Sequence, residues 1–560
     1  MNSVIALLLG LGVVVLGYRV YAGWVDRRII QPDAKRATPA RMFMDGVDFM
    51  PTPRNVLFGY QFKSIAGAAP VVGAIVALQW GWLPAMLWLF FGVFFIGWLH
   101  DYASAMIAMR NEGMTFGGLS YRLISPRARL ILLGFVYFYL LLVAGAFGAI
   151  VADLMAKVGQ SVIGLLVLIA AGLLTGQMIY RWRLGIILTS LVTVVLAVGG
   201  ILAGAYLPAG RFMGGLAANT TVWALFAFLF CYLGATLPIW RFAQPINYVS
   251  FYIVFLGLVG GVIGAFVGHP NFTLPAFTQI TVPNVGPLWP ILFVTLACGA
   301  VSGWHSLVSS SGTARQLESE ADARPVAAGS MFAEMMLGLL ALVAGAVAFT
   351  GFEGYAASLK AGPGVVFAAG LSKLLAYIAV PVALGKTFAA VLIIVLAITV
   401  MQLVIRFMRI AAAELVGDQL PVMRNVHVAS LVACGLGLLL VKTGWWQYLW
   451  ILFGGANQLM ASLALLLVSV WLVSQHRRAT FAILPMIFMF VTTIAALAYT
   501  AYSLFVKVLS RAVAPEQMAG NALMAVIAVF LILAALVLAA DGTRALRAHR
   551  AQPAPAPSQG

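Results

Sequence analysis

Charged residues are scarce in this sequence. Asp, Glu, Lys and Arg make up 9% of the 560 residues, whereas hydrophobic residues make up 63%. Soluble domains carry about 25% charged residues, so the composition excludes an ordinary soluble globular protein. The apolar residues form many runs of about 20, long enough to cross a hydrocarbon core about 30 Å thick. Such long runs predict an all-α polytopic membrane protein rather than a β-barrel of short alternating strands.

Cysteine is rarer still. Cys231, Cys298 and Cys434 each lie in a separate apolar run, so neither a disulfide framework nor a zinc site is indicated. The sequence also lacks the GxSxG, Walker and HExxH patterns of hydrolases, ATP-driven pumps and zinc proteases. We therefore expect no enzyme activity, no cofactor and no metal centre.

Acidic residues are outnumbered by basic ones, 16 to 33, which gives a formal net charge of +17. The basic residues lie in short loops between the apolar runs, where they act as topology signals, so we expect no nucleic-acid partner. Basic loops alternate with loops such as 270–287, which contains no Lys or Arg. This alternation predicts a multi-pass inner-membrane protein with its amino terminus outside and its carboxyl terminus in the cytoplasm.

The hydropathy pattern predicts about 15 transmembrane helices. The first span, 3–24, lacks a basic leader and is interpreted as retained rather than as a signal peptide. The apolar stretch 364–382, interrupted by Gly and Lys373, is interpreted as a surface or re-entrant helix. The predicted parts are a first span with a basic cytoplasmic loop (1–57), a five-span repeat (58–207), a second, inverted five-span repeat (221–411), four C-terminal spans (412–541) and a disordered cytoplasmic tail (542–560).

Two predicted spans carry helix breakers at their centres. Gly67-Ala68-Ala69-Pro70 interrupts the span 58–81, and Gly234 with Pro238 interrupts the span 221–240. A single breaker only kinks a helix, but interrupted helices at matching positions of two inverted halves indicate a transporter's central site. We therefore predict that substrate is bound by Gly67, Ala68, Ala69, Pro70, Gly234 and Pro238, together with His305 and Ser306.

Several motifs stand out from the apolar background. They are Asp45-Gly46-Val47-Asp48, Pro51-Thr52 through Val56-Leu57-Phe58-Gly59, Ile65-Ala66-Gly67-Ala68-Ala69-Pro70, Leu237-Pro238-Ile239-Trp240, Ala297-Cys298-Gly299-Ala300-Val301-Ser302-Gly303 with His305 and Ser309-Ser310, and Phe453-Gly454-Gly455-Ala456-Asn457-Gln458. Together they resemble the carbon starvation protein A family over residues 18–340 and 396–475. The resemblance implies the LeuT-like inverted-repeat fold of the amino acid–polyamine–organocation transporters. It also implies a secondary active transporter that imports pyruvate or short peptides by alternating access, driven by a cation gradient.

The sequence departs from that family's pattern at several polar positions. Tyr60-Gln61 replaces a pair of histidines, and His100-Asp101 replaces a Gln-Asp pair. Pro245-Ile246-Asn247-Tyr248 lacks the Arg and Asp of the family's Pro-Arg-Asp-Tyr run, and Gln402 stands where the family has an Asp. These departures leave the fold and the class intact, but they leave the substrate and the coupling ion open.

Lys63 lies just before the first break, where an ammonium needs carbonyls, a carboxylate or water. It either stands where a sodium ion would sit, or carries a proton, or snorkels to the cytoplasmic headgroups. We predict that it lies beside Ser309 and Ser310, so that its charge repels Na⁺ and makes transport independent of Na⁺. The predicted set for ion or proton coupling is Lys63, Ala66, Ser302, Ser309, Ser310 and Glu334.

Other polar residues within predicted spans have simpler interpretations. Glu334 must be protonated or paired, which favours a coupling or gating role. His305 is either a hydrogen-bonded structural residue or a proton carrier. His100-Asp101, near the cytoplasmic end of its span, is interpreted as an interfacial anchor, and Asn457-Gln458 as a polar contact between helices.

Two other classes of function stay open at this point. The lost family residues suit a nutrient sensor that keeps the transporter fold without transporting. A membrane haem protein would use His100 and His305 as ligands. For the transporter we expect a small-molecule substrate, the lipid bilayer and H⁺ or Na⁺ as partners, and the oligomeric state is not indicated.

Overall fold

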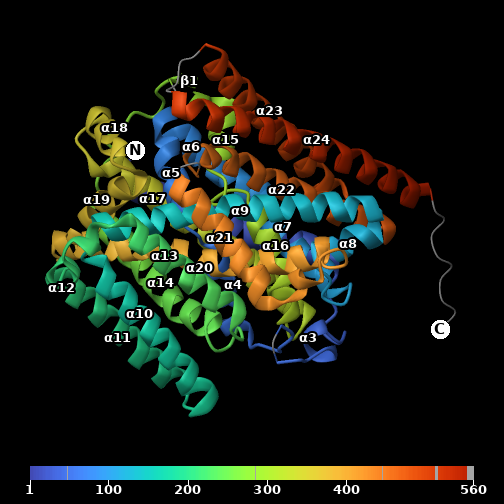
Figure 1. Ribbon diagram of the computed structural model, residues 1–560, viewed down its shortest axis with the longest axis horizontal. Coiled ribbons are helices and arrows are strands. Elements are labelled where there is room, and N and C mark those ends of the chain that lie inside the picture. The colour runs from blue at the N-terminus through green and yellow to red at the C-terminus, as the bar shows by residue number, and fades with distance from the viewer. Residues whose placement is uncertain (47, 284, 444–445, 511–514, 552–560) are drawn as a thin grey trace.

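The structure is a computed structural model that describes residues 1–46, 48–283, 285–443, 446–510 and 515–551. It is built almost wholly of helices that cross and recross one bundle (Figure 1). Among the described residues, 11 helices are long and apolar enough to cross a membrane, or up to 13 if each of two bent helix pairs counts as one span. This confirms a polytopic helical membrane protein, while the number of 15 spans stays a prediction.

The helices have the following bounds. The first part of the chain forms α1 (Ser3–Val15), α2 (Gly23–Val25), α3 (Pro39–Met42), α4 (Arg54–Ile65), α5 (Ala69–Ala77), α6 (Trp82–Gly92), α7 (Trp98–Met109), α8 (Phe116–Leu123), α9 (Pro126–Lys157), α10 (Ser161–Gly176) and α11 (Ile186–Tyr206). The middle part forms α12 (Gly210–Met213), α13 (Thr220–Thr236), α14 (Ala243–Gly268), α15 (Phe293–Thr295), α16 (Gly303–Ser311), α17 (Gly329–Ala348), α18 (Phe352–Lys360), α19 (Pro363–Ala376) and α20 (Val382–Val416). The last part forms α21 (Val426–Thr443), α22 (Trp446–Ser474), α23 (Thr480–Leu509) and α24 (Pro515–Ala551), and a short hairpin pairs β1 (Thr281–Val282) with β2 (Gly286–Pro287) in antiparallel fashion.

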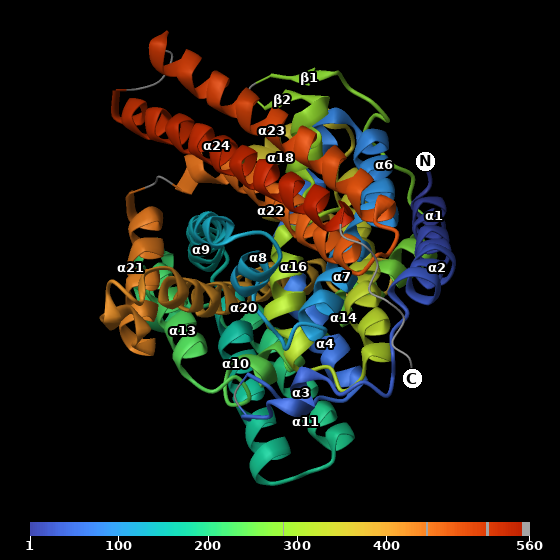
Figure 2. The same cartoon turned by 90° about the vertical axis from the view of Figure 1, so that its right-hand side faces the viewer.

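The core of the bundle lies around α20 and α22. In the most apolar stretch of each of these helices, 94% of the residues are buried, because other helices surround them on every side. In contrast, only 28% of the corresponding stretch of α11 is buried. Figure 2 shows α10 and α11 as a hairpin at the edge of the bundle, far from α23 and α24. The apolar outer surface of α11 therefore faces lipid in a membrane.

Loops that are predicted to lie on the same side of the membrane meet at the same end of the bundle. At one end, which we call the basic end, Arg110 donates to Glu320 at 2.7 Å and Arg477 donates to the Ile30 carbonyl at 2.5 Å. At the opposite end, Ser3 N donates to the Pro270 carbonyl at 3.0 Å. Figure 1 shows the N-terminus, α18 and β1 toward one side and α3 and α8 toward the other. This grouping agrees with the alternation of basic and non-basic loops, whereas the absolute orientation stays a prediction.

The predicted disorder of 542–560 is wrong over its first part. The helix α24 continues to Ala551, and 552–560 lie outside the described residues. Residues Thr543–Ala551 are rich in the strong helix formers Ala, Leu and Arg. Gly542 packs so closely on α22 that a Cβ there would lie 2.6 Å from Leu466. Helix propensity and this contact extend the helix beyond the apolar run.

The first predicted break is confirmed. The helices α4 and α5 are separated by the non-helical residues Ala66–Ala68, and their axes differ by 49°. Pro70 stands at the beginning of α5, where its missing N–H costs no hydrogen bond. The break therefore frees backbone carbonyls and N–H groups inside the protein.

The second predicted break is wrong. The helix α13 runs through Gly234 without interruption and ends at Thr236, so Pro238 simply follows a helix end. Gly234 is small because Gln402 packs on it: a Cβ there would lie 2.6 Å from Gln402 Oε1. The second interruption lies instead at Leu296–Ser302, between α15 and α16.

Candidate functional site

The two interrupted helices cross with their breaks in contact. Gly299, in the second break, approaches Pro70, so that a Cβ on Gly299 would lie 3.7 Å from Pro70 Cα. Gly73 approaches the other helix even more closely: a Cβ there would lie 2.6 Å from the Thr295 carbonyl oxygen, which only glycine permits. Backbone groups freed by both breaks are thereby gathered in one place inside the bundle.

On the basic-end side of the breaks, polar side chains connect α4 with α16. Gln61 Nε2 donates to Ser309 Oγ at 2.9 Å, and Gln61 Oε1 accepts a hydrogen bond from Thr313. Trp304 Nε1 donates to the Ser64 carbonyl at 2.7 Å. These contacts hold the two half-helices together, and all of the side chains involved are buried.

Lys63 lies on another face of α4. Its side chain is fully buried, and Nζ donates to Thr399 Oγ1 at 2.6 Å and to the Ala66 carbonyl at 3.3 Å. The snorkelling interpretation is therefore wrong. Thr399 belongs to α20, and Ala66 is the first residue of the first break. The ammonium thus has two oxygen partners, one from each of two helices.

The predicted neighbours of Lys63 are also wrong. Ser309 accepts its hydrogen bond from Gln61, and Ser310 Oγ donates to the Ser306 carbonyl at 2.8 Å. The reason is helical geometry: residues two apart on a helix point about 200° apart. Gln61 and Lys63 therefore face different neighbours, α16 and α20. Ser302 is not on the helical face of the other serines either, because it lies in the second break.

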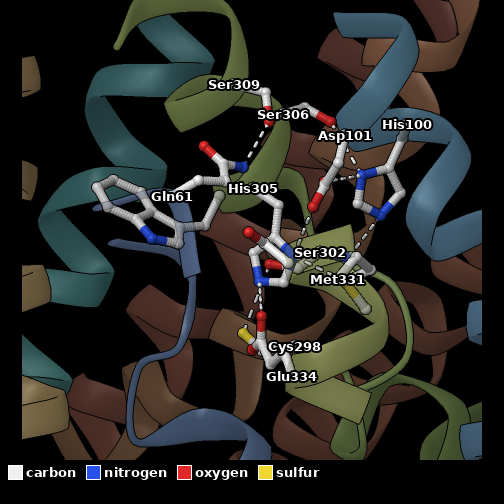
Figure 3. A network of polar contacts seen from close by, with 12 residues as sticks. Gln61, His100, Asp101, Cys298, Ser302, His305, Ser306, Ser309, Met331 and Glu334 are labelled. Carbon is white, nitrogen blue, oxygen red and sulfur yellow. Dashed lines mark hydrogen bonds and ion pairs between the residues drawn. The ribbon is translucent and has the colours of Figure 1, made fainter. Parts of the chain in front are cut away.

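A second cluster of polar residues lies beside the breaks (Figure 3). It contains His100 and Asp101 of α7, His305 of α16 and Glu334 of α17, all fully buried, and we call it the acid–histidine cluster. His305 Nε2 lies 3.2 Å from a Glu334 carboxyl oxygen, and His305 Nδ1 lies 3.5 Å from Asp101 Oδ2. His100 Nδ1 lies 2.7 Å from Asp101 Oδ1. The cluster is thus a chain in which carboxyl and imidazole groups alternate.

The tautomer of His100 follows from its contacts. Ser302 N donates to His100 Nε2 at 3.1 Å, so this nitrogen is an acceptor and the ring proton is on Nδ1, facing Asp101 and Ser306. The interpretation of His100 and Asp101 as interfacial anchors is therefore wrong. Gly97 explains why: a Cβ there would lie 2.5 Å from the Ala300 carbonyl, so α7 packs directly on the second break.

The two carboxyl groups of the cluster have few donors. Among the described residues, no group donates a well-aligned hydrogen bond to Asp101 or Glu334, although imidazole nitrogens lie within 2.7 to 3.5 Å. An unpaired carboxylate is costly in such an interior, so each carboxyl is stable when protonated or when it faces an imidazolium. Burial therefore favours a proton on each carboxyl or on the imidazole that faces it.

Asn457 ties the second break to the centre of the bundle. Its Oδ1 accepts from Tyr139 Oη at 2.7 Å, Trp304 N at 3.1 Å and Ser302 Oγ at 3.2 Å. Tyr139 belongs to α9 and Asn457 to α22, so the amide connects three segments, the polar helix contact predicted for it. Gln458 Nε2 makes a similar contact, donating to the Phe293 carbonyl at 2.8 Å.

Comparison with known proteins identifies the family. A family model described as "Carbon starvation protein CstA" matches residues 2–353 and 351–496. The chain belongs to this family. It is 32% identical over 344 residues to the pyruvate/proton symporter BtsT of Escherichia coli (strain K12), which covers 60% of this chain and 48% of the symporter. It is 25% identical over 537 residues to the peptide transporter CstA of Bacillus subtilis (strain 168), which covers 88% and 89% of the two chains.

In most of the curated CstA-family relatives, the match covers about half of the relative's own length. The chain spans about half the length of the Escherichia coli relatives, 48% in each of two cases. Their names describe transporters rather than enzymes. Among solved structures, a manganese transporter of Eremococcus coleocola is similar over 90% of this chain and 99% of its own, with a TM-score of 0.38 and 15% identity.

Two departures from the CstA-family pattern contact each other. Gln402 Nε2 donates to Asn247 Oδ1 at 3.3 Å, and both side chains are fully buried. The nearby Arg406 donates to the carbonyls of Gly234 and Leu237 at 3.1 and 2.6 Å. The backbone carbonyls at the end of α13 are thus occupied by Arg406.

Ion pairs close the basic end over the half-helices α4 and α16. Asp48 lies 3.8 Å from Arg406 and 4.0 Å from Arg315, and Met50 N donates to the Arg315 carbonyl at 3.2 Å. Thr52 N donates to the Gln316 carbonyl at 3.0 Å. The segment 48–52 therefore links α20 with the residues that follow α16, and we call this segment the clasp.

Proposed function

We propose that this chain is a secondary active transporter that imports small nutrients, pyruvate or short peptides, across the inner membrane by alternating access. The observation that carries the proposal is the contact between two broken helices, which brings non-helical backbone from both into the interior of a membrane bundle. Membership in a family whose relatives are named as a pyruvate/proton symporter and peptide transporters supports it. The substrate site then lies at Gly67–Pro70 and at the second break, beside His305 and Ser306.

The proposed topology has about 15 spans and two inverted repeats, with the amino terminus outside. The proposed repeats, 58–207 and 221–411, each contain one interrupted helix pair, α4–α5 and α15–α16, and the two breaks are in contact. Cysteines introduced at positions 275 and 321, both exposed, should react with impermeant reagents from opposite sides of the membrane. The native cysteines are buried and give little background. Labelling of both positions from one side would contradict this topology.

The proposed coupling ion is H⁺ rather than Na⁺. Lys63 already supplies a positive charge to the Thr399 hydroxyl and the Ala66 carbonyl, the kind of oxygen ligands that Na⁺ uses. Two unit charges about 4 Å apart repel by about 4 kcal/mol at an effective dielectric near 20, so Lys63 excludes a sodium ion. The acid–histidine cluster then carries the proton, with Glu334 as the acid at the end of the cluster.

Uptake into proteoliposomes tests the function. Purified protein should accumulate pyruvate or a dipeptide when the inward pH gradient is imposed, equally in Na⁺ and choline buffers. A several-fold stimulation by Na⁺ would contradict the proposed coupling. Binding of a substrate without uptake would favour the sensor over the transporter.

A substitution in the first break tests the site. A Cβ on Gly67 would already lie 3.1 Å from Phe147, so Gly67→Leu should abolish uptake while the protein still folds. Gly12→Leu is the matched control, because no atom lies within 4 Å of its Cβ position. Normal uptake by Gly67→Leu would count decisively against a site at the breaks.

A further inference from the structure

A cavity leads to the breaks from the end opposite the basic end. It has a volume of about 250 Å³, and it lies between the half-helices α5 and α15 on one side and α22 and α23 on the other. Ala69 and Ala297, at the two breaks, line its inner part. Lys507, in the last turn of α23, lines its outer part. The cavity therefore connects the proposed site with the far end of a helix that lies outside both repeats.

The wall formed by α23 is mostly polar, with Leu504 as its apolar member. Tyr499, Ser503 and Lys507 follow one another at intervals of four residues, and Thr500 lies on the same side, so one helix face presents three hydroxyls and an ammonium. The facing wall is apolar and includes Val72, Val76 and Val294. The cavity thus offers a charged and hydroxylated side to one part of a ligand and an apolar side to the other.

The charge of the lining has one sign. Lys507 is the one charged residue among the described residues that line the cavity, and none of them is acidic. Among the side chains that the structure describes, which do not include that of Glu516, no carboxylate forms an ion pair with Lys507. An ammonium that is half-buried beside hydroxyls attracts an anion and repels a cation. A ligand with a carboxylate and a small apolar group fits both walls.

We propose that this cavity is an entry site for small organic carboxylates, in which Lys507 binds the carboxylate before the molecule reaches the breaks. This inference rests on the proposed function and names the chemical class of the substrate. The volume of about 250 Å³ lies below the range of pockets for drug-sized ligands, which limits the ligand to a small acid or a dipeptide. Both have a carboxylate that Lys507 can bind and an apolar side group that the valines can contact.

Ligand binding to the purified full-length protein tests the site without requiring transport. Titration calorimetry would use pyruvate, the dipeptide Ala-Ala and, as a neutral isostere, pyruvamide. Hydrogen bonds to charged groups contribute enough that Lys507→Gln should weaken the binding of the better carboxylate by about tenfold or more. Lys507→Arg should keep most of the affinity, and pyruvamide should bind the wild-type protein as weakly as the carboxylate binds Lys507→Gln.

The matched control is Lys442→Gln. Lys442 lies at the end of α21 and donates to Thr221 Oγ1 at 2.6 Å, and it does not line the cavity. The control removes the same charge and should leave affinity unchanged. Unchanged affinity in Lys507→Gln would overturn the proposal, and so would equal losses in Lys507→Gln and Lys442→Gln, which would indicate a general effect of surface charge.

Transport measurements separate this inference from the proposed function. In proteoliposomes, Lys507→Gln should raise the KM for the carboxylate about tenfold while the maximal rate stays near the wild-type value. Wild-type binding of carboxylates without any uptake would support the entry site and contradict the transporter. Uptake of a neutral nutrient by a wild-type protein that binds neither carboxylate would support the transporter and overturn the entry site.

Discussion

The two sides of the broken helices differ in the chemistry of their contacts. Toward the basic end, α4 and α16 are joined by side-chain hydrogen bonds of Gln61, Ser309 and Trp304, under the clasp formed by Asp48. Toward the opposite end, α5 and α15 meet through the backbone at Gly73 and line a cavity. The two half-helices α4 and α16 are therefore held together by polar side-chain contacts. The two half-helices α5 and α15 are held together by close packing of their backbones.

This difference indicates which side moves. A hydrogen bond between side chains contributes about 0.5–1.5 kcal/mol net, because water replaces the partner when the contact opens. Separating the packed backbones of α5 and α15 offers no such replacement for the lost contacts. We infer that α4 and α16 separate during a transport cycle, whereas α5 and α15 remain together. The substitutions below would break or sharpen this comparison.

Removing the ammonium at the first break should have the largest effect. In Lys63→Ala, Thr399 and the Ala66 carbonyl lose a charged partner, and two hydrogen bonds to a charged group contribute about 3 kcal/mol or more, roughly 100-fold in rate. Uptake into proteoliposomes should fall by that factor and recover in part in Na⁺ but not in choline buffer. Lys35→Ala, at an exposed position of the basic loop, is the control. Wild-type uptake by Lys63→Ala would refute the role of this ammonium.

Neutralising Glu334 of the acid–histidine cluster should remove the coupling of uptake to the proton gradient. One pH unit corresponds to about 1.36 kcal/mol per proton, or roughly tenfold accumulation of substrate. Glu334→Gln should lose this tenfold accumulation while it still exchanges labelled for unlabelled substrate. Glu353→Gln, on the separate helix α18, should behave as the wild type. Accumulation by Glu334→Gln that still follows the pH gradient would place the proton elsewhere.

Adding one methyl group on the packed side should destabilise the protein. In Gly73→Ala, the new Cβ would lie 2.6 Å from the Thr295 carbonyl, and such overpacking costs about 1–3 kcal/mol. The melting temperature in detergent should fall by several degrees relative to the wild type, whereas Gly12→Ala should leave it unchanged. Equal melting temperatures for the two variants would contradict a rigid, closely packed contact between α5 and α15.

Weakening the clasp should have the smallest effect. The ion pairs of Asp48 are long and its side chain is partly exposed, so each contributes up to about 1 kcal/mol. Asp48→Asn should therefore raise the labelling rate of a cysteine introduced at Ser309 about two- to fivefold. Asp418→Asn, which removes an exposed ion pair with Arg424, should not change that rate. A lower rate in Asp48→Asn would mean that the clasp does not hold the basic end closed.

Much of the fold could be predicted from the sequence, because hydropathy and loop charge report directly on membrane spans. The first break was also predictable, since Gly67 and Pro70 are strong helix breakers. The second break was missed because Ala297–Gly303 contains no proline, whereas Gly234 and Pro238 form a stronger local signal. Local breakers show only where a helix is able to end, and the contacts of Gly234 with Gln402 decide that α13 continues.

The candidate site was less predictable, because it depends on the rotation and the neighbours of each helix. The side of α4 that carries Lys63 could not be assigned to α20 from the sequence. His100 and Asp101 were placed near the membrane surface by their distance from the next loop, yet Gly97 allows α7 to pack on the second break. The small residue at 97 was the one local signal for this close approach.

The departures from the family pattern also make sense only in three dimensions. Asn247 and Gln402 are far apart in sequence, and each on its own suggests the loss of a functional acid. In the structure they form one buried amide pair, so the two departures from the pattern are hydrogen-bonded to each other. This favours a protein with altered chemistry at that position over one whose interior has decayed.

The attachment of Lys63 to the chain has a consequence for energy use. A dissolved cation that accompanies the substrate is released on the other side, whereas this ammonium stays with α4 throughout. When a monocarboxylate crosses with one proton, the net charge moved is then zero. A carrier that moves one net charge gains or loses about 2.3 kcal/mol per 100 mV of membrane potential. For a monocarboxylate the proposed cycle is electroneutral, so the acidity difference drives its uptake and the voltage does not.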